Sequence, residues 1–423
     1  MSGTIGDNVY RASGVIASAA GGGTSWQSVE TGPTMTAVAG NGYPVNTTAQ
    51  ACTVTLPAGS VGDTIEFVDY AGTWDTNKVR ITADGSEKIK GSTDDAEFTA
   101  ERQGVKIVYV DATQGWVATT GVNETVPALN PPSYNVDFLC IAGGAGGGGS
   151  AYGGGGGAGG YRNSYNSETS GGGSASETAA SLLEGTQYTI TVGAGGPAST
   201  VATQGNAGVD SSISGTGFTT ITSAGGGGGG EQTTDGSDGG SGGGAGAWDG
   251  SGPSDAGGAG TADQGYAGGV AGIGVGAGAN SGTGGGGGAG VVGGAGSGTT
   301  AGSGGNGLAS SITASAVTRA GGGGGSAYYG SDPGANGGTG GGGEGGWKND
   351  AGSPSTAGAV NTGSGGGAPS ATAVGEGAAG GSGVVILRMA TASYTGTYTN
   401  AETPIVDGTD TILVFNAAGT YTA

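Results

Sequence analysis

The sequence predicts a mostly β protein made of a small all-β module followed by a longer glycine-rich domain. Short β-branched runs with period-two alternation recur between residues 25 and 122, separated by turns that contain glycine. Of the 110 glycines, 90 lie between residues 143 and 383. Two strongly β-forming runs, 136–141 and 384–389, stand on either side of this glycine tract.

The amino-terminal part divides into an arm and a module. Residues 1–24 are too short and too polar to fold alone, and they end in a glycine hinge at 21–23. Residues 25–122 have ordinary composition and predict an all-β module. Its clearest strands are expected at 52–56, 64–68, 78–81 and 105–110.

A proline-containing linker, residues 123–135, marks the next boundary, because Pro127, Pro131 and Pro132 are incompatible with a helix or a central strand. The glycine-rich domain is expected at 136–389. Pairing of its bracketing runs would bring its entry and exit side by side and make it a closed domain. Residues 390–423 form a C-terminal β segment with one further strand, 411–415.

The glycine tract also contains an internal repeat. The order GNAGVDSSI, TSA and six glycines at 205–230 returns about 100 residues later as GNGLASSI, TRA and five glycines at 305–325. Low-complexity sequence would not keep that order. The tract is therefore predicted to consist of repeated structural units.

Glycine runs have no side chains to bury, so they can cohere only through main-chain hydrogen bonds and close contact. A left-handed helix with three residues per turn directs its N–H and C=O groups outward, where neighbouring helices of glycine can reach them. We therefore expect packed polyglycine II-type helices, with the spacers between runs displayed as loops at their ends. The alternative is a flexible linker, which glycine and serine usually indicate.

Composition excludes several functions. The chain has no histidine, so catalysis by Ser-His-Asp or Cys-His and histidine-based zinc sites are ruled out. Its formal net charge of −21 argues against nucleic acid as a partner. No run of 18 apolar residues exists, so membrane insertion is not expected. Irregular aspartate spacing gives no metal site, and we expect no cofactor and no catalytic residues.

Two sets of motifs carry a family resemblance. The opening MSGTIGDNVYRASGVIAS, with NGYPVNTT, VTLPAGSVGDTIEFVDYAGTWDTN and VKIVYVDATQGW, resembles tail-fibre and other virion structural proteins of marine and cyanobacterial tailed phages. The motifs FLCIAGGAGGGG, GGYRNS, YTITVGAGG, TSAGGGGGG and GSGVVILRM resemble the glycine-rich domain that ends many such proteins. Together the two sets cover nearly the whole chain.

The resemblance implies a homotrimeric fibre in the virion. Residues 1–24 would attach it to a tail or adaptor protein, the β module would trimerise, and a distal glycine-rich domain akin to phage adhesins would present receptor-binding loops. The expected function is a non-enzymatic fibre or adhesin that recognises a host surface polysaccharide or outer-membrane protein. The alternative is a purely structural fibre or decoration protein of tail, baseplate or neck, without receptor contact.

Aromatic residues between the glycine runs are the candidate contact residues. Each is either a plug that covers the hydrogen-bonded core or part of a binding surface, where aromatic and arginine anchors are typical. Tyr188 and Phe218 lie in β-like runs and are expected to be plugs. The receptor-binding candidates are Tyr161, Arg162, Asn163, Trp248, Asp249, Tyr266, Tyr328, Tyr329, Trp347 and Lys348.

Overall fold

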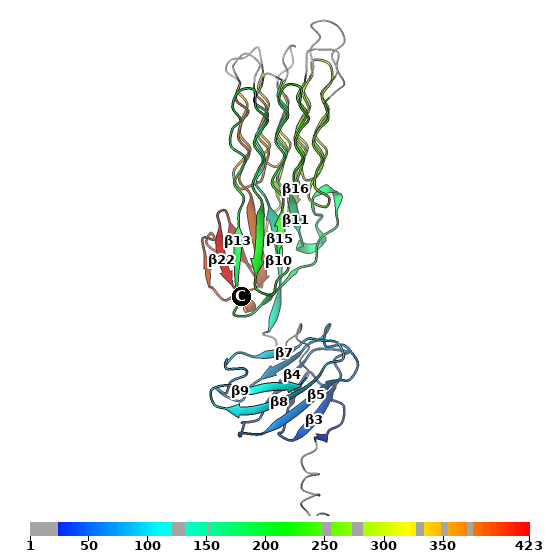
Figure 1. The fold of residues 1–423 in the computed structure, drawn as a ribbon, viewed down its shortest axis with the longest axis vertical. Helices are drawn as coiled ribbons and strands as arrows, with labels where there is room; N and C mark the ends of the chain where they lie inside the picture. Colours follow the sequence, from blue (N-terminus) through cyan, green and yellow to red (C-terminus); the bar gives the residue numbers. More distant parts are fainter. Residues whose placement is uncertain are drawn as a thin grey trace, which may run out of the picture. The chain divides into compact units, whose positions relative to one another are not determined.

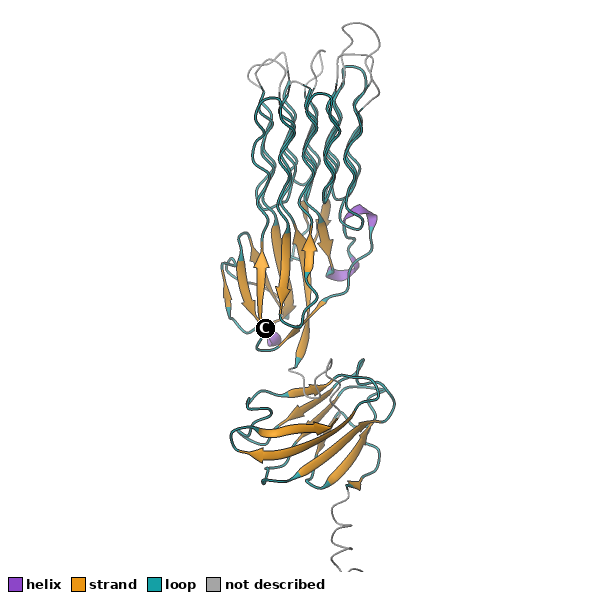
Figure 2. Cartoon of the chain, in the orientation of Figure 1, coloured by secondary structure: helices purple, strands orange, loops and turns teal. Residues whose placement is uncertain are grey.

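The computed structural model describes residues 24–120, 132–150, 152–247, 255–272, 282–326, 334–347, 354–369 and 375–423. The chain divides into two compact units, Met1–Ser133 and Tyr134–Ala423, which we call the amino-terminal unit and the glycine unit. Within the described residues, regular structure consists of β-strands and single 3₁₀ turns (Figure 1, Figure 2). None of these elements is a helix long and apolar enough to cross a membrane.

The amino-terminal unit is a sandwich of two sheets whose strands alternate along the chain. From β1 to β6 successive strands join opposite sheets, so neighbours there are parallel, as β3 with β5 and β4 with β6, whereas β7, β8 and β9 pair antiparallel. The expected strands are confirmed with shifts of at most one residue at each end. One sheet has the order β1 (Ser25–Trp26), β3 (Asn41–Val45), β5 (Thr64–Asp69), β8 (Gly104–Asp111), β9 (Gly115–Thr120), and the other β2 (Thr34–Thr36), β4 (Cys52–Thr55), β6 (Val79–Thr82), β7 (Ala96–Phe98).

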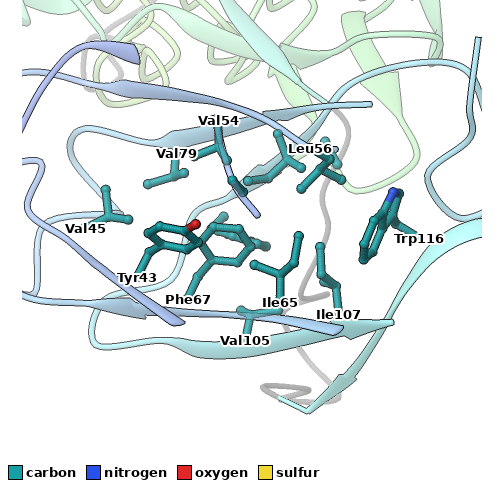
Figure 3. Packing of buried hydrophobic residues seen from close by; sticks show 14 of the residues in the cluster. Tyr43, Val45, Val54, Leu56, Ile65, Phe67, Val79, Val105, Ile107 and Trp116 are labelled. Atoms are coloured by element: carbon teal, nitrogen blue, oxygen red, sulfur yellow. The ribbon is translucent and has the colours of Figure 1, made fainter. Parts of the chain in front are cut away.

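The core of the sandwich follows from the period-two pattern. In β5 the buried positions alternate with half-buried ones, so Ile65 and Phe67 face inward while Glu66 and Val68 face outward. The aromatic rings of Phe67, Trp74 and Phe98 pack in series, with centroids 5.2–5.3 Å apart. Figure 3 shows part of this apolar interior.

The glycine unit has sheets at one end, from which the glycine runs extend (Figure 2). Apart from the hairpin β16 (Leu308–Ser310) and β17 (Val317–Arg319), its strands form two larger sheets. One contains β10 (Ser133–Ile141), β11 (Tyr161–Asn163), β12 (Ala180–Leu183), β18 (Val384–Ala390), β20 (Ile405–Asp407) and β21 (Asp410–Phe415). The other contains β13 (Gln187–Thr191), β14 (Ser211–Gly215), β15 (Ile221–Ser223), β19 (Tyr398–Thr399) and β22 (Gly419–Thr422).

The pairing of the two bracketing runs is confirmed. Strands β10 and β18 are antiparallel, with Ile141 opposite Val384, so the glycine tract begins and ends at adjacent positions. The carboxyl-terminal segment holds more than the one strand expected. Its four strands complete both larger sheets, because β21 pairs with β18 and β22 pairs with β13. Residues 390–423 thus lie in the same compact unit as the glycine tract.

The hydrogen bonds between glycine runs repeat every three residues. In the run after Tyr152, the N–H groups of residues 154, 157 and 160 donate to residues 230, 227 and 224 of one neighbouring run. Those of residues 155 and 158 donate to 284 and 287 of a second run, and those of 156 and 159 to 366 and 363 of a third. This run is therefore bonded on three sides, unlike a β-strand, which bonds on two.

The internal repeat corresponds to one structural unit used twice. In the first copy a glycine run enters the hairpin β14–β15, and in the second an equivalent run enters the hairpin β16–β17. A further glycine run leaves each hairpin, after Ser223 and after Arg319. In each copy of the repeat, the chain thus forms a glycine run, then a hairpin, then a second glycine run.

Candidate functional site

The glycine runs meet at a common end opposite the sheets, which we call the far end (Figure 1). Hydrogen bonds join the described residues there: Ala247 N–H donates to Tyr152 O at 2.9 Å, and Gly272 N–H donates to Gly282 O at 2.9 Å. Gly346 N–H likewise donates to Ala368 O at 2.8 Å. The far end is therefore a connected surface built from distant parts of the chain.

Buried serine and threonine hydroxyl groups hold the far end together by hydrogen bonds. The Ser326 N–H donates to Thr283 Oγ1 at 2.8 Å, and Ser326 Oγ donates to Gly153 O at 3.1 Å. Ser199 Oγ donates to Gly147 O at 2.8 Å and accepts from Gly377 N–H at 2.9 Å. Where the main-chain hydrogen bonds between glycine runs end, a hydroxyl group thus acts as the donor or acceptor that a neighbouring run would otherwise provide. These bonds fix the ends of the runs relative to one another.

A small apolar cluster lies beside these hydroxyls. Tyr152 packs with Ala245, Ala247 and Ala271, all of them buried. Tyr152 was not among the predicted contact residues, and its ring is 8 % exposed. It covers the ends of the runs, as expected of a plug.

Carboxylates bind the amides of the outer runs. Asp235 Oδ1 accepts from Ala256 N–H at 2.7 Å, and Asp238 Oδ1 accepts from Ala259 N–H at 2.6 Å, again three residues apart. Nearby, burial and the charge of Asp235 raise the pKa of Asp255. These side chains replace the carbonyl groups that a further glycine run would provide. They give this side of the bundle a negative surface.

The structure places Tyr161, Arg162 and Asn163 away from the far end, in strand β11. Tyr161 and Asn163 are fully buried, and burial raises the pKa of the Tyr161 hydroxyl. Arg162 Nε donates to Glu177 Oε1 at 2.9 Å, and this hydrogen bond with Glu177 raises the guanidinium pKa. Alternation along β11 turns Tyr161 and Asn163 inward, so these two offer no contact surface in this conformation, whereas Arg162 is half-buried and paired with Glu177.

The remaining candidates fall into three groups. Tyr266 is half-buried, and its hydroxyl lies beside Gly173 in the 3₁₀ turn Gly171–Gly173. Trp347 is half-buried at the far end, where its indole N–H is buried without an acceptor among the described residues. Trp248, Asp249, Tyr328, Tyr329 and Lys348 lie outside the described residues.

Of the two expected plugs, Tyr188 is fully buried in the apolar core of the sheets, and the half-buried Phe218 meets it edge to face, with centroids 5.4 Å apart. The sequence analysis did not predict the buried hydroxyl groups of Ser199, Thr283 and Ser326 at the far end. The available signal was a single serine or threonine directly flanking a glycine run, as at Thr283 and Ser326. Among the described residues, no group of acidic or cysteine side chains is arranged to hold a metal ion.

Comparisons with known proteins match both units. Residues 119–390 match the family described as "Glycine-rich domain", and residues 3–125 match the family described as "Bacteriophage T4 gp9/10-like protein, N-terminal". The baseplate wedge protein gp10 of Enterobacteria phage T4 is 35 % identical over 81 residues. That stretch covers 18 % of this chain and 14 % of the relative, so this chain spans about a seventh of the relative's length.

Proposed function

Because the chain belongs to the glycine-rich domain family, we propose that it is a virion fibre or adhesin whose packed glycine helices present host-recognition segments at the far end. At a coarser level, its likeness to the gp9/10 family and to the gp10 wedge protein identifies a bacteriophage structural protein located in the virion. Host recognition and the polyglycine II type of the packed helices go beyond what these matches establish.

The three-residue period of the hydrogen bonds is the observation that carries the proposal. A polyglycine II-type helix has three residues per turn, so successive N–H groups point in three directions. Bonds from residues 154, 155 and 156 reach three different runs, as that helix requires. Such a lattice is stiff, because an inner run such as 154–160 is hydrogen-bonded to three neighbours along its length.

The chain connectivity supports presentation at the far end. Described residues on either side of five sequence segments lie there: 247 and 255, 272 and 282, 326 and 334, 347 and 354, 369 and 375. These segments differ in sequence while the runs beneath them are alike. A rigid scaffold with variable segments at one end is suited to recognition, because the scaffold supports changes in the segments.

The amino-terminal unit suits attachment and assembly. The gp9/10-like match begins at residue 3, so it includes the arm together with the β module. We propose that residues 1–24 bind a tail or adaptor protein of the virion and that the module forms a homotrimer. Light scattering of the purified chain would test the trimer, and a monomer mass would refute it.

A purely structural role without receptor contact is the second candidate function. The observation that favours it is the relative named a baseplate wedge protein. Both candidates are non-enzymatic, which agrees with a chain that has no histidine.

Adsorption of phage carrying altered genes separates the two candidates. Each far-end segment, such as residues 248–254 or 327–333, is replaced by a glycine-serine linker of equal length. The matched control replaces residues 313–316, in the hairpin turn between β16 and β17 at the sheet end. The adhesin proposal expects slower adsorption to host cells from at least one far-end replacement and unchanged adsorption from the control. If every far-end replacement leaves adsorption unchanged and the particle yield is normal, the adhesin proposal is refuted and the purely structural role is supported.

A further inference from the structure

The sheet β1-β3-β5-β8-β9 packs only one of its faces on the core of the amino-terminal unit. On the other face, which we call the outer face, Pro44 lies opposite Val68, and Val108 lies opposite Val117. Trp26 is 53 % exposed there. The face thus combines an aromatic ring and aliphatic groups, and no described element of this unit covers it.

A shallow groove of about 300 Å³ crosses the outer face. Its wall is Trp26, whose ring lies over Gly42 so closely that an added Cβ would stand 2.8 Å from it. Lys106 Nζ and Glu66 Oε1 form an ion pair at 3.0 Å in the groove. At Gly104 a Cβ would meet nothing within 4 Å, so the groove stays open there.

We propose that residues 1–23 of the same chain cover the outer face. The chain leaves the described structure at Thr24, whose hydroxyl donates to Glu66 in the groove, so the arm starts on this face. A 23-residue segment can extend about 75 Å, whereas five strands are about 24 Å wide. The gp9/10-like pattern begins at residue 3, so it treats the arm and the module as one unit.

Area and the arm's composition favour this arm over a second copy of the module. Five strands of about five residues present only ~400 Å², about half of what each partner of a stable complex normally buries. Residues 1–23 contain one aspartate and one arginine, so their side chains are neutral overall, and they supply apolar groups at Ile5, Val9, Tyr10, Val15 and Ile16.

Photo-crosslinking of the full chain tests the proposal, which does not depend on receptor contact at the far end. A benzophenone amino acid replaces Val108 on the outer face, and the control position is Val406 in the glycine unit, which is 66 % exposed. Mass spectrometry of an equal mixture of ¹⁵N-labelled and unlabelled protein should find crosslinks from 108 to residues 1–23 of the same chain. Position 406 should give none. Crosslinks from 108 to residues 24–120 of another copy, or none to the arm, would overturn the proposal.

Trypsin cleavage after Arg11 provides a second readout. If the arm docks on the outer face, the pair Val68→Glu and Val108→Glu should release it and speed cleavage by about fivefold, the effect of losing roughly 1 kcal/mol of docking. Val406→Glu is the matched control and should leave the rate unchanged. Equal rates in all three proteins, with the amino-terminal unit melting normally, would refute docking.

Discussion

Replacing Gly286 by alanine tests whether the glycine runs are a close-packed lattice. A Cβ at this position would lie 2.0 Å from Gly156 O, and real Cβ atoms keep at least 3.0 Å. The two runs would therefore have to separate by about 1 Å, which stretches the bonds between them, such as Ala158 N–Gly287 O, now 3.0 Å, beyond hydrogen-bonding distance.

The expected cost follows from the bonds affected. Gly155 N–H to Gly284 O and Ala158 N–H to Gly287 O join these two runs, and Gly286 N–H to Gly323 O lies at the substituted residue. Three hydrogen bonds at about 1 kcal/mol each, less about 0.5–1 kcal/mol for the reduced entropy of the unfolded chain, give a net loss of about 2–2.5 kcal/mol. For a unit of this size that corresponds to a melting temperature lower by about 4 °C.

Calorimetry and deuterium exchange measure this effect. The run 282–290 should exchange faster in Gly286→Ala than in the unaltered protein. The control Gly104→Ala makes the same chemical change in the amino-terminal unit, where a Cβ meets nothing within 4 Å, and should leave the melting of the glycine unit and the exchange of the run 282–290 unchanged. If Gly286→Ala matches the unaltered protein in melting and in exchange, the runs are not close-packed and the lattice argument fails.

Three further predictions concern the sheets. Truncation after residue 404 removes β20, β21 and β22, so the glycine unit should lose its cooperative calorimetric transition, and a full transition would contradict this. Glu177→Gln weakens the two-point contact with Arg162 and should lower the free energy of unfolding in urea by about 1 kcal/mol; an unchanged value would show that the pair adds nothing. Hydrogen bonds from Thr24 and Lys106 lower the pKa of Glu66 from its ordinary 4.5, so ionised Glu66 stabilises the fold at neutral pH and loses this effect as pH falls through the lowered value. Melting curves of Glu66→Gln should thus approach those of the unaltered protein only below about pH 4.5, and a gap independent of pH would contradict the assignment.

Side-chain patterns determined what could be predicted from the sequence. The β-branched runs at 136–141 and 384–389 predicted their own pairing, and the repeated motif predicted a repeated unit that proved to be a hairpin between glycine runs. The pairing of β13 with β22, more than 200 residues apart, could not be predicted, because neither strand carries a distinctive pattern. Tyr161 was misleading for a related reason. A tyrosine beside glycines has the same local sequence whether it plugs the interior or faces solvent.

Hydrogen bonds alone do not fix the register of the glycine runs. A run of glycines shifted by three residues along its neighbours would make the same pattern of hydrogen bonds. Side chains at the ends of the runs fix the register instead. At the sheets, Ser211 Oγ donates to Ile141 O at 2.8 Å and Ser223 Oγ donates to Cys140 O at 2.7 Å, which fixes where the runs begin. At the far end, Ser199 and Ser326 fix where they stop.

Register in this domain is therefore encoded by few residues. A shift of one run would break its hydroxyl contacts at both ends and would also move its alanines. Ala158 and Ala289 are fully buried within the lattice, at positions where a methyl group fits, whereas a Cβ on neighbouring glycines such as Gly286 would overlap backbone oxygen. The rare side chains thus select one alignment among many that hydrogen bonds alone would make nearly equal in energy. This explains how a sequence with so few large apolar groups can specify a single structure.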